Sequence, residues 1–285
     1  MQFNKKILID STIGLIMGGG LVFLVYEVID KQTLLKFFPT ESALSNTIFF
    51  SSVVLAPFVA IALHELGHLF AGLLQNFKTE LYVVGFLGIK RENNKLRVYF
   101  NTNVQYFGGV AATSPTKLLE ETDLINKYKL ILISGPIASL VVAFAAIGYF
   151  LFNNSLFNPF FGILGVASFG IFLATTLPEK TGIFFTDRKR FQRLNDKGEI
   201  GKTELAFLQI VNQTLLENTC KNIAIDKLAL LKKDADNIIQ FWGHYFEYQY
   251  FKDNNMADAA LETKANLLSY KSYLPNAFWK TLAIE

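Results

Sequence analysis

The 285-residue chain is poor in the residues that build disulfide frameworks, nucleic-acid interfaces and highly charged soluble surfaces. It has one cysteine, Cys220, which excludes an internal disulfide and any metal site made from several thiolates. Its formal net charge of +3 is too small to favour nucleic acid as a partner. Only 18% of its residues are charged, against about 25% in a typical soluble domain.

Apolar residues are gathered into four long runs, which is the pattern of a membrane protein. A bilayer-spanning helix needs about 20 predominantly apolar residues, and 51% of this chain is hydrophobic. The first run could instead be a signal peptide, but "GLVFLVYEVIDK" offers no small-x-small cleavage site, so an uncleaved helix is favoured. The sequence predicts a mainly α membrane protein with about four transmembrane helices, near residues 7–28, 48–74, 130–152 and 160–178.

Basic residues are concentrated on one side of these predicted helices. The segment between the second and third helices and the segment after the fourth are rich in lysine and arginine, whereas the loop "NNSLFN" contains neither. Positively charged loops remain in the cytoplasm. We therefore expect a multi-pass protein of the cell membrane, with both termini in the cytoplasm and the lipid bilayer as a partner.

The character of the chain changes after Thr186, where charged and amphipathic sequence replaces the apolar runs. We divide the chain into a membrane-embedded domain, residues 1–190, and a helical cytoplasmic domain, residues 191–285. In the second, "FWGHYFEYQYFKDNNMADAALETKANLLSY" predicts two helices around a polar turn. We expect this domain to serve contacts with a protein partner or regulation. The basic stretch "RKRFQR" is interpreted as a membrane-surface anchor.

The segment between the second and third helices is rich in β-branched and aromatic residues. "RENNK" supplies a turn, so we predict a membrane-associated β-hairpin here. Gly108 and Gly109 indicate a bulge or a close backbone approach. An exposed sheet edge could pair with an extended substrate. Alternatively, the segment is a connector that rests on the membrane.

The stretch "HELGH" places two histidines and a glutamate inside an apolar helix. A charged residue at the centre of a spanning helix costs about 2.5–3.5 kcal/mol on insertion scales, so one that persists usually has a partner and a role. His64 and His68 are four residues apart and therefore share one helix face, where both can bind one zinc ion. Glu65 can reach a metal-bound water without ligating the metal. A fortuitous pair of buried histidines is the alternative.

A catalytic zinc usually takes three protein ligands and keeps one position for water. A carboxylate near the end of the fourth helix is the better candidate for the third ligand, because Cys220 and His244 lie in the predicted soluble part. The helix is interrupted at Pro178, and Asp187 follows on the same side of the bilayer as the histidines. Glu179 is the rival ligand. Alternatively, Asp187 is an ordinary charged residue beside the membrane and not a metal ligand.

Four pieces of the chain, "HELGH", "YFGGVAATSP", "SGPIASL" and "TTLPEKTGIFFTDRKR", are similar to motifs of the site-2 protease family of intramembrane zinc metalloproteases. They span roughly residues 48–190. The resemblance implies that His64 and His68 ligate zinc, that Glu65 is catalytic and that Asp187 is the third ligand.

The third motif also matches a family pattern, Gly-x-x-x-Ser, at Gly135 and Ser139. From the residues alone, these two form a small-xxx-small face that lets helices approach closely. We interpret them as a packing seam with no direct catalytic part.

The function expected from these features is an intramembrane zinc metalloendopeptidase. Its substrates would be membrane-embedded or membrane-associated polypeptides, its cofactor Zn²⁺, and its general base Glu65. One alternative is a catalytically silent relative that binds membrane proteins. A metal-ion or small-solute carrier is another, and the absence of an inverted repeat weighs against it.

Overall fold

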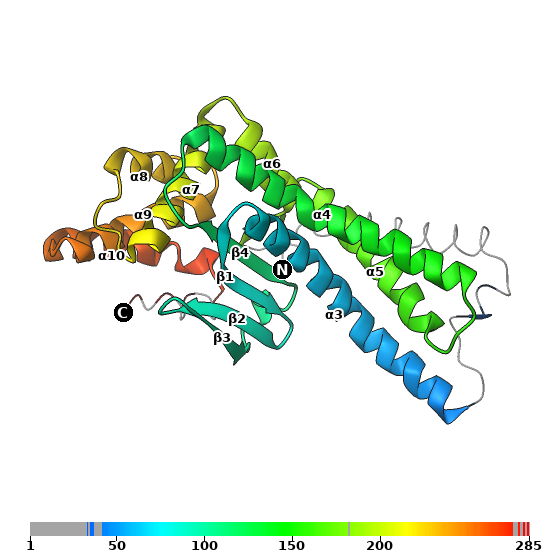
Figure 1. The fold of residues 1–285 in the computed structure, drawn as a ribbon. Coiled ribbons are helices and arrows are strands. Elements are labelled where there is room, and N and C mark those ends of the chain that lie inside the picture. Colours follow the sequence, from blue (N-terminus) through cyan, green and yellow to red (C-terminus); the bar gives the residue numbers. More distant parts are fainter. Residues whose placement is uncertain are drawn as a thin grey trace, which may run out of the picture.

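The computed structural model describes most of the chain as an elongated, mainly helical molecule. Three mostly apolar helices form one end, the helices that follow them in the chain form the other, and a small sheet lies beside the apolar helices (Figure 1). The predicted helix near residues 7–28 lies outside the described part. The described residues are 42–181 and 183–275, together with Thr33, Leu35, Lys36, Trp279, Leu282 and Ile284.

Three described helices are long and apolar enough to cross a membrane: α3 (Ala43–Leu74), α4 (Glu121–Phe152) and α5 (Asn158–Thr176). They correspond to the predictions near residues 48–74, 130–152 and 160–178. Helix α4 begins earlier than predicted because its first turn is charged, and acidic side chains there are stabilised by the helix dipole. Helix α5 ends before Pro178, and the intervening Leu177 is extended, as a residue before proline prefers.

Small residues allow these three helices to pack closely. Ala56 and Ala60 of α3 form a buried cluster with Ala146 of α4 and Leu164 of α5. A Cβ added at Gly67 of α3 would overlap the α4 backbone. Close approach through small residues is typical of helices that associate in lipid, where apolar burial gives no driving force.

The segment between α3 and α4 folds into a four-stranded antiparallel sheet, larger than the single hairpin that we predicted. The predicted hairpin is present, and its turn at Asn93 and Asn94 has positive φ at both residues, as a tight hairpin requires. A second turn, at Gly85 with φ of 55°, was not predicted because it lies within a continuous apolar run. The strand order is β3-β2-β1-β4, with β1 Phe77–Val84, β2 Leu87–Glu92, β3 Lys95–Phe100 and β4 Val110–Pro115.

The sheet lies along the second half of α3. The Tyr82 hydroxyl of β1 donates to the carbonyl of Ala62, 3.1 Å away. A Cβ at Gly85 would meet the Phe58 ring. Strand β1 therefore runs back along the helix that it follows, which brings the edge strand β4 beside the "HELGH" turn.

After α5, a short hairpin turns the chain back before the C-terminal helices begin. It consists of β5 (Lys180–Thr181) and β6 (Phe184–Phe185), and α6 (Asp187–Asn195) follows at once. The next four helices, here termed the C-terminal helical region, are α7 Glu199–Glu217, α8 Ile225–Lys232, α9 Asn237–Asp253 and α10 Ala257–Ser269.

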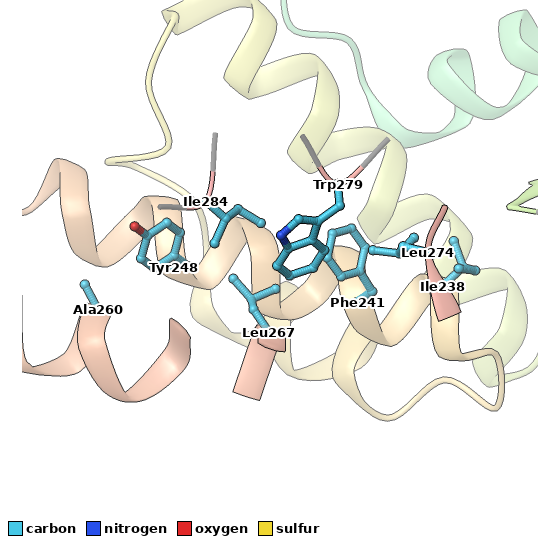
Figure 2. Packing of buried hydrophobic residues seen from close by; sticks show 8 residues of the cluster. All are labelled: Ile238, Phe241, Tyr248, Ala260, Leu267, Leu274, Trp279 and Ile284. Atoms are coloured by element: carbon cyan, nitrogen blue, oxygen red, sulfur yellow. The ribbon is translucent and has the colours of Figure 1, made fainter. Parts of the chain in front are cut away.

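The C-terminal helical region has its own apolar packing. The predicted two helices around a polar turn are α9 and α10, separated by Asn254, Asn255 and Met256. Phe241 of α9 is fully buried and packs against Leu267 of α10 and Trp279 (Figure 2). The boundary between the two predicted domains, at residue 190, stays a prediction.

Candidate metal centre

Two buried histidines of α3 face each other across one helical turn. His64 and His68 are four residues apart, so they project from the same face of the helix. Their Nε2 atoms are 3.2 Å apart, and both side chains are buried. Helix α4 lies against this face and contacts both rings.

Helix α4 fixes the orientation of each ring through the other nitrogen. Nδ1 of His64 lies 2.9 Å from the Ser139 hydroxyl, and Nδ1 of His68 lies 2.7 Å from the carbonyl oxygen of Ile131. A carbonyl can only accept, so Nδ1 of His68 donates, and Nε2 of the neutral ring carries a free lone pair. This is the tautomer that binds a metal through Nε2.

Asp187 brings a carboxylate to the same place from a distant part of the chain. It is the first residue of α6, whose N-terminus Thr186 caps by accepting from the Lys189 N–H. Its Oδ2 lies 3.4 Å from Nε2 of His64 and 3.4 Å from Nε2 of His68. The rival candidate Glu179 is exposed and lies immediately before β5.

These three atoms have the spacing and chemistry of a zinc ligand set. Ligands 2.0–2.1 Å from zinc at tetrahedral angles lie about 3.3–3.4 Å from each other, close to the three distances observed. Oδ2 of Asp187 is buried and has no hydrogen-bond partner among the residues that the structure describes. Two imidazole nitrogens and a carboxylate oxygen are a donor set that zinc accepts, so His64, His68 and Asp187 fit zinc.

Glu65 lies beside this group, but its side chain lies against the start of β4, whereas the histidine rings contact α4. Its side chain is buried and interacts electrostatically with both histidines. The Ala111 backbone amide of β4 is within hydrogen-bonding reach of its carboxylate. Gly109 has φ of 95°, and a Cβ there would lie 2.5 Å from Oε1 of Glu65. The predicted close backbone approach is therefore found at Gly109, directly against the glutamate.

The interpretation of Gly135 and Ser139 as a packing seam alone was incomplete. Gly135 does pack closely, since the α3 residue Gly67 lies against its Cα. A Cβ at Gly135 would also overlap the His68 imidazole, and Ser139 contacts His64 directly. Ile131 was not singled out at all, because a backbone carbonyl leaves no signal in the sequence.

The membrane-anchor interpretation of "RKRFQR" was also wrong for two of its arginines. Arg190 and Arg193 make ion pairs with Glu204, which is fully buried. The sequence places these opposite charges in separate segments, so their pairing could not be read from the basic stretch alone.

The family model described as peptidase family M50 matches residues 52–277, most of the chain and all of the site described above. The chain belongs to peptidase family M50. This confirms the resemblance to site-2 proteases, which are integral membrane zinc metalloproteases. No curated protein and no solved structure matches the chain.

Proposed function

We propose that this M50 protein is an intramembrane zinc metalloendopeptidase that hydrolyses peptide bonds of membrane-embedded or membrane-associated polypeptides. The observation that carries the proposal is the convergence of the Asp187 carboxylate of α6 with two histidine nitrogens of the apolar helix α3. Metal ligation offsets the penalty that lipid imposes on these side chains. The alternative of a catalytically silent binding module is not proposed, because the family match implies a peptidase and the expected ligand residues and Glu65 are all present.

Each residue has a distinct task in this proposal. His64, His68 and Asp187 would hold zinc, which polarises a carbonyl and makes a coordinated water acidic. Glu65 would take a proton from the attacking water as general base and later deliver a proton to the leaving amine. Ser139 and the Ile131 carbonyl keep the histidine rings in their binding orientation.

The sheet offers a way to present a substrate to Glu65. Strand β4 is an edge strand that pairs with β1 alone among the described strands. Its start, at Gly109 to Ala111, lies against the Glu65 side chain. An extended peptide readily pairs with such an edge. We propose that an unwound segment of a membrane-embedded helix pairs here before cleavage.

The arrangement of the helices supports a centre near the cytoplasmic side of the membrane. His64 and His68 lie in the later half of α3, their partners lie in the first two-thirds of α4, and Asp187 follows the end of α5. These ends carry the basic segments that favour the cytoplasm. We propose a multi-pass cell-membrane protein with both termini cytoplasmic.

Cleavage of a transmembrane polypeptide in reconstituted vesicles tests the proposal. Wild type should cleave, and Glu65→Gln should not, although it should retain zinc because Glu65 serves the water and not the metal. Equal turnover by both proteins would refute the role of Glu65. Glu179→Gln is the matched control, since it also neutralises a carboxylate and should keep activity.

A further inference from the structure

Helix α6 connects the metal centre to the C-terminal helical region. Asp187 at its first turn faces the histidine pair. Near its other end, Leu194 is buried with Leu132 of α4 and Leu208 of α7. Because α6 is short, its packing between α4 and α7 at one end fixes the position of Asp187 at the other end.

Arg193 anchors that second end through two buried ion pairs. Its Nε lies 2.7 Å from Oε2 of Glu204 on α7, and its Nη2 lies 2.7 Å from Oδ2 of Asp234, which precedes α9. Arg190 of α6 also reaches Glu204, with Nη2 2.9 Å from Oε1. Arg193 is 7% exposed and Glu204 0% exposed. Buried charges persist only when paired, and the planar guanidinium fixes the geometry of both partners.

The protonation state of Arg193 is secured by the same contacts. Burial alone would lower the pKa of its guanidinium, but the carboxylates of Asp234 and Glu204 raise the pKa above its usual value. The guanidinium of Arg193 therefore keeps its positive charge in the folded protein.

The hairpin before Asp187 is attached to the C-terminal helical region as well. Lys180 of β5 pairs with Asp236, the N-cap of α9, at 2.7 Å. Ile183 and Phe185 pack against the apolar clusters of that region. The β5–β6 hairpin and α6, which flank Asp187, therefore both contact the C-terminal helical region. Helix α6 also packs on α4, which contacts the two histidines.

We propose that Arg193 is a positioning residue for the metal site. By pairing with Glu204 and Asp234, it docks α6 on the C-terminal helical region, and this docking holds Asp187 against His64 and His68. The inference rests on the proposed role of Asp187 as a metal ligand. When α6 undocks, the site loses one ligand of three and keeps the histidine pair, so its zinc affinity falls to that of a site without Asp187.

Zinc dissociation constants of the full-length protein, measured in detergent by competition with a chromogenic chelator, test this. The variants are Arg193→Met, Arg193→Lys and Lys180→Met. Asp187→Asn supplies the benchmark. The matched control is Lys232→Met, which breaks an ion pair with Glu247 inside the C-terminal helical region and leaves the ion pairs of α6 and of the β5–β6 hairpin unchanged.

Arg193→Met should weaken zinc binding by about tenfold or more, the scale seen when supporting residues of a metal ligand are lost. Lys180→Met should weaken it less, and Lys232→Met should match wild type. Arg193→Lys should recover part of the affinity, because lysine keeps the charge without the planar fork. In an Asp187→Asn background, Arg193→Met should add no further loss, since it acts through that ligand.

Three outcomes separate the two claims. Wild-type affinity in Arg193→Met and Lys180→Met, with weakened Asp187→Asn, would overturn this inference and leave the proposed function standing. If Arg193→Met weakens zinc binding as much in the Asp187→Asn background as in otherwise wild-type protein, the inference is also overturned, because the effect would then not depend on Asp187. Unchanged affinity in Asp187→Asn would instead refute the ligand assignment itself.

Loss of folding is detected by the thiol of Cys220, which is 5% exposed in the C-terminal helical region. If Arg193→Met exposes this thiol to a labelling reagent, the zinc affinity of Lys180→Met becomes the test of the inference. The ion pair of Lys180 with Asp236 is partly exposed, so its loss leaves the buried core intact. Weakened zinc binding in Lys180→Met then supports the inference, and wild-type binding overturns it.

Discussion

The Ser139 hydroxyl of α4 lies 2.9 Å from Nδ1 of His64 on α3, so a residue of one apolar helix orients a proposed metal ligand on another. Ser139→Ala should lower zinc affinity about 10- to 100-fold, because supporting hydrogen bonds fix the ligand tautomer and ring orientation. Chelator competition measures this. Ser168→Ala is the control, since Ser168 on α5 is equally buried and its hydroxyl bonds to none of the described residues. Equal affinity in the two variants would contradict the orienting role.

Gly135→Ala should abolish high-affinity zinc binding. The added Cβ would overlap the His68 imidazole, which the Ile131 carbonyl holds in place on its other side. Zinc content after purification is the measurement. Gly148→Ala on the same helix meets no described atom within 4 Å and should retain zinc. Full metal content in Gly135→Ala would show that the ring is free to move.

Gly109→Ala should lower the turnover number about 100-fold and spare the metal, the loss expected when a general base is misplaced. The substitution strains a backbone with φ of 95° and presses on the Glu65 carboxylate. Cleavage rate and zinc content are measured on the same sample. The neighbouring Gly108→Ala meets no described atom within 4 Å and serves as the control. Loss of zinc together with activity would assign Gly109 to the fold alone.

Cys220 should resist alkylation in the folded protein. Burial raises the pKa of its thiol above the usual value, so the reactive thiolate is suppressed. The raised pKa also links protein stability to pH, because the folded protein favours the neutral thiol. The contribution of this thiol to the free energy of unfolding is fully present below the pKa of the unfolded thiol, and it is lost as pH rises through the folded-state pKa. Labelling at pH 8 should be slow in native protein and fast in denaturant. Rapid native labelling would contradict the burial of this residue.

The proximity of His64 and His68 could be predicted from the sequence because its determinant is local. The four-residue spacing of His64 and His68 places them on one face of any α-helix. Helix α5 ends before Pro178 because proline has no backbone N–H to donate and its ring clashes with the preceding turn. The position of Asp187 against the histidines depends on a two-strand hairpin and on packing with the C-terminal helices, which no local pattern encodes.

The features that sequence reasoning missed depend on contacts between distant segments. The four-stranded sheet arises from pairing of β1 with β4 across two intervening strands. The buried ion pairs of Arg193 join α6 to α7 and to the loop before α9. A run of basic residues looks the same in sequence whether it meets lipid headgroups or buried carboxylates, so only the fold distinguishes the two.

The zinc content of carefully purified protein, by elemental analysis of wild type beside Asp187→Asn and Glu179→Gln, tests the central claim most directly. One ligand set of two histidines and one aspartate predicts about one zinc per chain in wild type and in Glu179→Gln. Asp187→Asn should lose most of that metal. Absence of zinc or a similar divalent ion from the intact wild-type protein, or full retention in Asp187→Asn, would contradict the account.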